Sequence, residues 1–499
     1  MNSGDFFLEF MEPIVGGVWE IIKTIGLKII GMFNIVNYVE IINKYKGQMG
    51  AGGTFMVILA VIALLALFAL LAFIIYRIVR RFVRYRHNVA HQEALVDEIE
   101  SLNNDIIKLK TENEKYLKMS GDGEVEYDEN GNIINKLNEG ESRFFKLTQI
   151  DRKYADYVKP ELNETITLEA LCDQFRNYAA SKMNLYYSID LIRLFIAAFA
   201  SNRLIILQGI SGTGKTSLAY AFGYFIKNES TIASVQPSWR DSTEIFGYFN
   251  EFTKRFNETE VLAKMYEAKY NNQIYITVLD EMNISRVEYY FAEMLSILEL
   301  PSQDEWIIDL VPNAWATDPK LLDNGRFKLP NNMWYIGTIN NDDSTFMITD
   351  KVYDRAMPIN IDTKGVAFEA PETESLDITA DYFTKLFKDA MEKYPVSEET
   401  MNKIAQMDDY VIEHFRLAFG NRIVKQLKEF VPAYVACGGN EMVAIDYLIA
   451  NKILRKFDQL NLAYIRGEID GFEDYLDQVF GKDVMVECKA FLERLKKTI

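Results

Sequence analysis

The hydrophobic and polar positions along this chain fall into segments of different character. The most apolar segment is residues 55–76 (FMVILAVIALLALFALLAFIIY), which contain no charged residue, no proline and no glycine. A helix of this length spans about 33 Å, and the hydrocarbon core of a bilayer is roughly 30 Å thick. The pattern therefore predicts one transmembrane helix in contact with lipid over residues 55–76, after an N-terminal segment of residues 1–54.

The charges on the two sides of this segment predict its orientation. Residues 1–54 carry four lysines and five acidic side chains, whereas five arginines follow the segment. Because positive charge is retained on the cytoplasmic side, we expect a single-pass protein of the cell inner membrane, with its N-terminus outside and its main body cytoplasmic. Residues 14–36 are apolar but interrupted by charges, which favours an amphipathic helix at the membrane interface. The five arginines are Arg77, Arg80, Arg81, Arg84 and Arg86.

Two further segments precede the main body. Within residues 77–118, apolar side chains recur at alternating spacings of four and three from Leu95 onward, which is the pattern of a short coiled coil. A helix packed on its own chain is the alternative interpretation. Residues 119–164 are expected to form a linker. Between Met119 and Glu141 its composition is polar and glycine-rich, and Asn130-Gly131 between two short runs predicts a small hairpin within it.

The rest of the chain first alternates strands with helices and then becomes helical. Short apolar runs at 203–208 (RLIILQ), 274–279 (IYITVL) and 333–338 (MWYIGT) are typical of buried strands, with helical patterns between them. We therefore expect an α/β domain over residues 165–365. From about residue 380 the apolar residues recur at helical spacing, which predicts an α-helical domain over residues 380–499.

The first of these strands leads directly into a glycine-rich loop. Residues 209–216 read GISGTGKT, which matches G-x4-G-K-[S/T], and a helical pattern follows. Backbone N–H groups of such a loop surround phosphate oxygens, the lysine reaches the β and γ oxygens, and the hydroxyl binds Mg²⁺. The sequence therefore predicts a nucleotide site formed by Gly209, Ser211, Gly212, Thr213, Gly214, Lys215 and Thr216.

Polar residues end the other two strands. Asp280 and Glu281 follow the second strand, and we expect Asp280 to bind the metal together with Thr216 while Glu281 activates the attacking water. Asn340 follows the third strand, where a polar side chain can orient that water. A residue that only caps a turn is the alternative interpretation of Asn340.

The order of these motifs resembles that of AAA+ ATPases. The likeness rests on the phosphate loop, LDEMN (279–283), GTIN (337–340) and DKVYDRA (350–356). Within that superfamily the chain is most similar to the McrB-like branch, the motor subunits of modification-dependent restriction systems, and less similar to MoxR-type ATPases. The resemblance covers roughly residues 165–490. It implies a P-loop NTPase domain with a β-hairpin insertion over 300–324 and a C-terminal α-helical lid.

The resemblance also implies roles for single residues. Asn340 matches sensor 1, Arg355 matches the arginine finger that reaches the nucleotide of a neighbouring subunit, and Arg422 matches sensor 2 of the lid. Arg286 is a further candidate that would act on a neighbour. A surface salt bridge is the alternative for each arginine. An arginine supplied by a neighbour requires a homo-oligomeric ring, which we expect to be a hexamer.

Composition and departures from the family pattern restrict the function. The chain has 54 basic and 72 acidic side chains, a net charge of −18, which disfavours direct nucleic-acid binding by this chain. Three histidines and three cysteines, badly spaced, provide no Cys/His zinc site and no disulfide framework. The Met-Asn-x-x-Asp signature of the GTP-using McrB is replaced by residues 339–343 (INNDD), so ATP is favoured and GTP stays open. No nuclease pattern follows the lid.

We therefore expect a membrane-anchored AAA+ NTPase that uses ATP or GTP with Mg²⁺. It would be the motor or switch subunit of a McrB-like, antiviral defence complex, and DNA cleavage would need a partner such as a McrC-like nuclease. Two alternatives stay open. One is a MoxR-like or chaperone-type remodeller of protein substrates, and the other is a nucleotide-switched membrane scaffold with negligible turnover.

Overall fold

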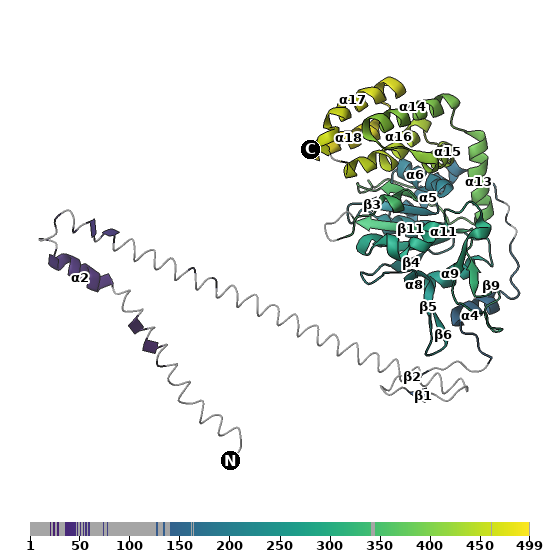
Figure 1. Cartoon of the computed structure of the whole chain (residues 1–499), viewed down its shortest axis with the longest axis horizontal. Helices are drawn as coiled ribbons and strands as arrows, with labels where there is room; N and C mark the ends of the chain where they lie inside the picture. Colours follow the sequence, from purple (N-terminus) through teal and green to yellow (C-terminus); the bar gives the residue numbers. More distant parts are fainter. Residues whose placement is uncertain are drawn as a thin grey trace, which may run out of the picture. The chain divides into compact units, whose positions relative to one another are not determined.

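The computed structural model describes residues 140–498 apart from 161, 163, 341–344 and 461, together with short runs before residue 140. The chain divides into two units, Met1–Glu124 and Val125–Ile499. In the first unit, helix α2 spans Ile35–Tyr45 and carries the purple colour of the early sequence in Figure 1.

The predicted localisation as a single-pass inner-membrane protein is wrong by the structure. Within the described residues, no helix combines the length and the apolar character that a membrane crossing requires. The two longest described helices, α14 (Glu398–Phe415) and α17 (Leu462–Phe480), carry several charged side chains along their length. Most of the predicted span 55–76, the coiled coil of 77–118 and the interfacial helix of 14–36 lies outside the described residues.

The second unit begins with a short antiparallel pair. Strand β1 (Glu126–Tyr127) pairs with β2 (Ile133–Ile134), with Glu126 opposite Ile134 and Tyr127 opposite Ile133. The residues between these strands lie outside the described part of the chain. Helix α4 (Phe145–Lys153) follows and packs against α9 (Glu260–Ala268).

The centre of the second unit is a parallel sheet of five strands. In spatial order they are β12 (Ala356–Asn360), β3 (Leu204–Gly209), β11 (Met333–Asn340), β7 (Tyr275–Asp280) and β4 (Thr231–Ser234). Every neighbouring pair is parallel, so the carboxyl ends of all five strands lie at one edge. The prediction of an α/β fold is confirmed, and β3, β7 and β11 are the three strands expected from the apolar runs.

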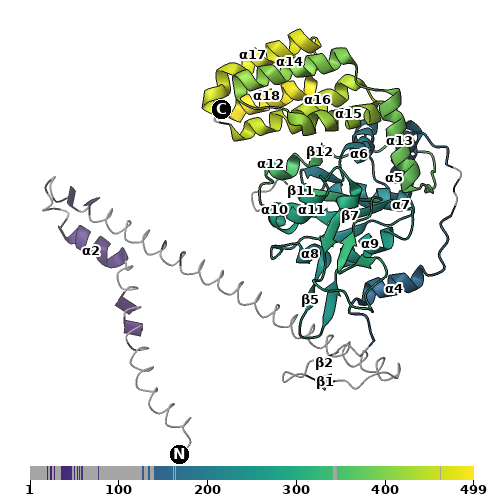
Figure 2. The same ribbon diagram turned by 45° about the vertical axis from the view of Figure 1, so that its right-hand side comes forward.

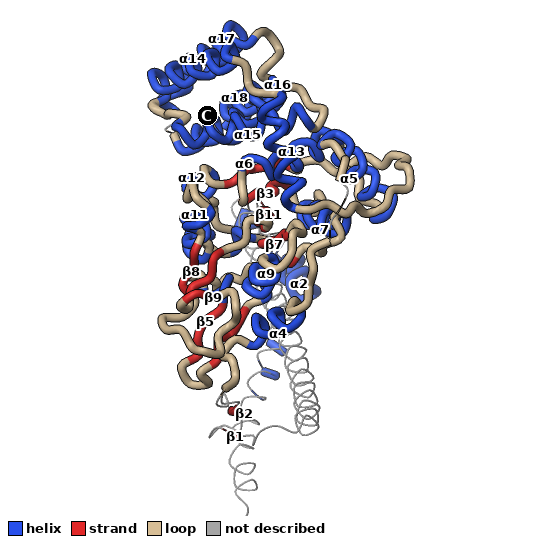
Figure 3. The backbone as a smooth tube through the Cα atoms, turned by 90° about the vertical axis from the view of Figure 1, so that its right-hand side faces the viewer, coloured by secondary structure: helices blue, strands red, loops and turns tan. Residues whose placement is uncertain are grey.

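Both faces of this sheet are buried. Ile205 and Leu207 of β3 belong to one hydrophobic cluster, and Leu204 and Ile206 belong to the other, as alternation along a strand requires. Figure 3 shows the strands in red with helices around them. The first cluster includes α5 (Leu168–Met183), α6 (Ile189–Ser201) and α7 (Lys215–Phe225), and the second includes α8 (Thr243–Phe246), α9, α10 (Val287–Tyr290) and α11 (Ala292–Ile297).

Smaller strands extend from the second cluster. Strands β5 (Gly247–Asn250) and β6 (Arg255–Glu258) form an antiparallel pair. A three-stranded antiparallel sheet has the order β8 (Ile307–Asp309), β10 (Arg326–Lys328), β9 (Leu322–Asp323). Strands β8 and β9 lie within residues 300–324, where the family resemblance implies an inserted β-hairpin, but they pair with β10 and not with each other. Short helical turns are η1 (Met282–Ile284), η2 (Gln303–Glu305) and α12 (Asp350–Tyr353).

The C-terminal part is helical and shares the core of the α/β part. Leu427 and Phe430 of α15 lie in the same buried cluster as Phe195 of α6. Because this core is continuous, the helices pack on the sheet domain, and Figure 2 shows them gathered above it; this helical part is called the lid below. The lid contains α13 (Ala380–Lys393), α14, α15 (Gly420–Ala436), α16 (Glu441–Lys452), η3 (Leu454–Gln459), α17 and α18 (Val486–Thr498).

Candidate nucleotide site

The glycine-rich loop joins the end of β3 to the start of α7. Gly209 is the last residue of the strand and has a φ of +143°, and an added Cβ would collide with the carbonyl oxygen of Ile361. Gly214 precedes the helix with a φ of +90°, which side chains other than glycine rarely adopt. The turn therefore requires glycine at both positions, for a close backbone contact at Gly209 and a positive φ at Gly214. The N-terminus of α7 faces the loop.

The predicted phosphate-binding lysine lies under this loop. Lys215 is only 6% exposed, and its Nζ donates to the carbonyl oxygens of Gly209 at 3.1 Å and Ile210 at 2.7 Å. Thr213 Oγ1 also donates to Ile210 O, at 2.9 Å, while Ser211 is exposed. The ammonium is therefore held within the concave side of the loop, where an anion would sit among backbone N–H groups.

Asp280 connects the loop helix with the neighbouring strand. Thr216 Oγ1, in the first turn of α7, donates to Asp280 Oδ1 at 2.7 Å. Thr338 Oγ1, on β11, donates to the same carboxylate oxygen at 2.8 Å. Three segments that are far apart in the sequence therefore meet at the carboxyl edge of the sheet, because β11 lies between β3 and β7.

Glu281 and Asn340 lie beside this group. Glu281 has φ 52° and ψ 46°, a left-handed conformation that costs a non-glycine residue about 1 kcal/mol or more. Its N–H donates to Thr338 Oγ1 at 2.9 Å, and its side chain is exposed. Asn340 Nδ2 lies 3.4 Å from Glu281 Oε1. The backbone thus holds an exposed carboxylate and an amide together, next to Asp280 and Thr216.

The oxygen atoms of this site suit a magnesium ion. The Thr216 hydroxyl and the Asp280 carboxylate are hard oxygen donors, and Mg²⁺ is typically held by one or two such groups plus water and substrate phosphates. The described residues contain no cluster of three or more His, Cys, Asp or Glu side chains that could hold a metal. Because their oxygens lie 2.7 Å apart beside the phosphate loop, Thr216 and Asp280 are the residues that would hold Mg²⁺.

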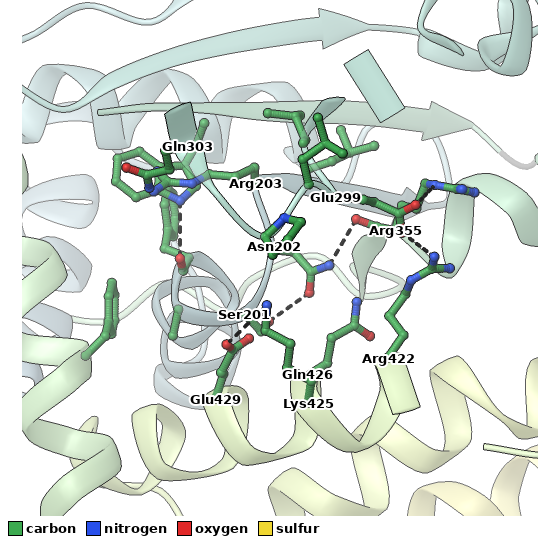
Figure 4. Close-up of a pocket in the computed structure, with 18 of the residues that line it drawn as sticks. Ser201, Asn202, Arg203, Glu299, Gln303, Arg355, Arg422, Lys425, Gln426 and Glu429 are labelled. Atoms are coloured by element: carbon green, nitrogen blue, oxygen red, sulfur yellow. Dashed lines mark hydrogen bonds and ion pairs between the residues drawn. The ribbon is translucent and has the colours of Figure 1, made fainter. Parts of the chain in front are cut away.

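The two predicted lid and finger arginines lie elsewhere in the unit. Arg355 Nε is 2.7 Å from Glu299 Oε2, and Arg422 is 2.5 Å from Glu299 Oε1. Figure 4 shows Arg355 from the sheet domain and Arg422 from the lid directed toward this one carboxylate. They line a cavity of about 700 Å³ with Asn202 and Arg203.

This cavity is at the end of the sheet opposite the phosphate loop. Asn202 and Arg203 immediately precede β3, whereas the loop follows it, and a six-residue strand spans about 20 Å. The structure therefore brings Arg355 and Arg422 together with each other but not with Lys215. Arg286, the further candidate, is exposed, and its guanidinium lies 5.3 Å from the ring centroid of Phe346.

A second cavity, of about 630 Å³, lies at the carboxyl edge next to Asn340. It includes two lid arginines, Arg455 and Arg494, that the sequence patterns did not single out. The guanidinium of Arg455 lies over the ring of Tyr353 at 3.0 Å, and burial lowers the pKa of Arg455 below its usual range. The lid thus does place arginines near the candidate site, but Arg422 is not one of them.

Hydrogen bonds among partly buried amides connect the loop strand with the lid. Tyr353 Oη donates to Gln208 Oε1 at 2.7 Å, and Gln208 Nε2 donates to Asn360 Oδ1 at 2.6 Å. Asn360 Nδ2 in turn donates to Asn451 Oδ1 of α16 at 2.8 Å. The signal that could have indicated these residues is an amide at the end of each of two buried strands, Gln208 in β3 and Asn360 in β12.

No family model matches the chain, and no curated protein matches it. Among solved structures, the chain is similar to the crystal structure of a full-length MCM homolog from Methanopyrus kandleri, with 9% sequence identity and a TM-score of 0.33. The match covers 58% of this chain and 62% of that chain, so this chain spans less than two thirds of the homolog. A similarity at this level assigns no function to the chain.

Proposed function

We propose that this chain is a nucleoside triphosphatase of the AAA+ type that works in a homo-oligomeric ring. The observation that carries the proposal is the shared carboxylate of Asp280, which accepts hydrogen bonds from Thr216 at 2.7 Å and from Thr338 at 2.8 Å. It joins the phosphate loop, the Asp-Glu pair and the strand that ends in Asn340. ATP is the proposed nucleotide, and GTP is the alternative.

In this proposal each residue of the site has one task. The loop N–H groups and Lys215 bind the β and γ phosphate oxygens, and Thr216 and Asp280 hold Mg²⁺. When bound, Mg²⁺ supplies charge neutralisation on the phosphoryl oxygens. Glu281 accepts a proton from the attacking water, and Asn340 orients that water, because the two side chains lie 3.4 Å apart.

The position of Arg355 supports a ring. Arg355 lies at the edge of the sheet opposite the phosphate loop of its own chain, where it pairs with Glu299, so the nucleotide that it would act on is that of another subunit. Head-to-tail contacts place opposite edges of successive subunits against each other, and they close into a ring when the rotation allows. Arg355 would then stabilise the charge that develops on the transferred phosphoryl group.

We propose further that the ring is the motor or switch of a McrB-like defence complex. Support for this finer assignment is the motif order and the extent of the sequence resemblance over residues 165–490. An effector such as a McrC-like nuclease would supply any DNA cleavage. A MoxR-like protein remodeller and a nucleotide-switched scaffold without turnover are the alternatives.

The test of the activity is a turnover assay on the purified full-length chain with ATP and GTP side by side. The proposal predicts turnover of at least one nucleotide and its loss in Glu281→Gln. Equal rates in the wild type and in Glu281→Gln would contradict the enzyme assignment. The scaffold alternative predicts nucleotide binding with negligible turnover in both proteins, and a protein substrate that stimulates turnover without any nuclease partner would favour the remodeller.

A further inference from the structure

The segment that carries Arg355 is held by a lysine of the lid. Lys452 is the last residue of α16 and is only 4% exposed. Its Nζ donates to the carbonyl oxygens of Tyr353 and Ala356, both at 2.6 Å, and of Asp354 at 3.3 Å. These three carbonyls flank Arg355 on both sides.

Other lid residues reach the same segment. Gln426 Nε2 of α15 donates to Asp354 O at 3.0 Å, and Lys456 Nζ of η3 is 2.9 Å from Asp354 Oδ1. The sheet domain contributes Asn202, whose Nδ2 donates to Arg355 O at 3.0 Å. Three elements of the lid therefore contact the residue directly before the arginine, and Asn202 of the sheet domain holds the carbonyl oxygen of the arginine itself.

A buried ammonium group in this place is costly unless its three donors are satisfied. Lys452 satisfies them with backbone carbonyls, one of which belongs to Tyr353, the last residue of α12. It therefore fixes the main chain and not another side chain. A movement of α16 must therefore either carry the 353–356 backbone with it or break hydrogen bonds to a buried charge. The side chain of Arg355 starts from this backbone.

We propose that Lys452 is a positioning residue for Arg355, through which the lid of one subunit sets how its arginine enters the nucleotide site of the next subunit. The inference rests on the proposed function, because it requires Arg355 to act on a neighbour. It gives the control between subunits a direction: the lid of one subunit controls hydrolysis in the site of the adjacent subunit and not in its own site.

Mixed rings test this direction. Two full-length chains with different affinity tags are co-expressed, purified through both tags, and assayed for ATP turnover. One chain is Glu281→Gln, which cannot hydrolyse but retains a correctly held Arg355. The other is Lys452→Met, which keeps its own Glu281 and loses the hydrogen bonds that hold the arginine segment.

Lys452→Met alone should lower kcat about 10²-fold, the cost of a small misplacement of a catalytic group. Mixing it with Glu281→Gln should raise turnover at least about tenfold over either variant alone, because an intact site then meets an intact Arg355. A defect confined to the site of the Lys452→Met chain itself would not be rescued. Wild-type turnover by Lys452→Met, or no gain on mixing, overturns the inference.

A second mixed ring, compared with the Lys452→Met pair, separates this inference from the proposed function. Arg355→Ala mixed with Glu281→Gln must also regain turnover. If that pair fails, the trans role of Arg355 fails and the inference falls with it. If that pair is rescued and the Lys452→Met pair is not, only the inference fails. Lys403→Met is the matched control, a lid lysine that pairs with Glu399 on α14 and should retain wild-type turnover.

A smaller change guards against a chain that does not fold. Gln426→Leu removes one hydrogen bond from the lid to Asp354 O and introduces no charge. It should lower turnover less than Lys452→Met and should likewise be rescued by Glu281→Gln. If Lys452→Met cannot be purified as a folded chain, an unrescued or absent defect in Gln426→Leu overturns the inference.

Discussion

Thr338 Oγ1 donates a hydrogen bond to Asp280 Oδ1 at 2.8 Å, and the two residues stand on neighbouring strands of the parallel sheet. The same hydroxyl accepts the N–H of Glu281 at 2.9 Å. One threonine therefore fixes both the orientation of the proposed metal-binding carboxylate and the left-handed backbone of the proposed base. The motifs that end the second and third predicted strands are therefore joined by direct hydrogen bonds, although about 57 residues separate them in the sequence.

The Thr338 hydroxyl gives a first prediction. Thr338→Val keeps the shape of the side chain but leaves the Glu281 N–H without its partner, at a cost of about 1–3 kcal/mol. Because this N–H belongs to the proposed base, its loss of a partner should displace Glu281, and kcat should fall about tenfold or more. Nucleotide affinity should change less. The measurement is ATP turnover against nucleotide concentration. Thr338→Ser retains the hydroxyl and should stay close to the wild type, and equal kcat values for all three proteins would contradict the assigned role.

The location of Arg422 gives a second prediction. Its partner is Glu299 in the cavity before β3, so Arg422→Ala should leave the affinity of its own chain for nucleotide nearly unchanged. The measurement is equilibrium binding of a fluorescent ATP analogue. Arg466→Ala, an exposed arginine of α17, is the control. A loss of affinity of about tenfold in Arg422→Ala, equivalent to about 1.4 kcal/mol, would show that Arg422 contacts the nucleotide of its own chain.

The buried lysine of the lid gives a prediction on pH. Burial lowers the pKa of Lys452 from its ordinary 10.5 to about 7, against the attraction of Asp354 and with repulsion from Lys456, Arg422 and Arg455. Because the folded value lies below the unfolded one, the unfolded chain binds more protons between about pH 7 and pH 10.5. The contribution of this group to stability therefore rises with pH across that window, by at most about 1.4 kcal/mol per pH unit.

Thermal unfolding of wild type and Lys452→Met at a series of pH values checks this sign. The stability difference, wild type minus variant, should increase from pH 7 to pH 9, and Lys403→Met should show no such trend. A difference that is constant with pH would mean that Lys452 keeps its ordinary pKa in the folded chain, and one that decreases would contradict the lowered pKa.

The sequence predicted those strands whose apolar composition by itself indicates burial. The apolar runs that form β3, β7 and β11 are buried on both faces, so their composition alone marks them as strands. Strand β4 is an edge strand with Ile232 44% exposed, and β12 is short and contains Pro358, so neither had a comparable pattern.

The positions of side chains that depend on packing between distant segments were not predicted from the sequence. Lys452 ends a helix with no sequence motif, and the docking of α16 on the 353–356 backbone gives its ammonium the buried partners. The place of Arg422 depends in the same way on how α15 packs against α6. Glu299 belongs to no motif, and it is recognised only because it pairs with two arginines that are 56 and 123 residues away in the sequence.

The central claim is that Lys215 and Glu281 belong to one nucleotide site with separate tasks. Binding of a fluorescent ATP analogue and ATP turnover are measured together on wild type, Lys215→Ala and Glu281→Gln. The controls are Lys227→Ala, which removes an exposed lysine paired with Asp377, and Glu288→Gln in α10. Both controls should match the wild type in binding and turnover.

That paired measurement is the most direct test of the account. It predicts that Lys215→Ala loses binding and turnover together, because the phosphate charge loses its buried partner. Glu281→Gln should bind as the wild type does and lose turnover. Normal binding and hydrolysis by Lys215→Ala, or turnover by Glu281→Gln at the wild-type rate, would contradict the account.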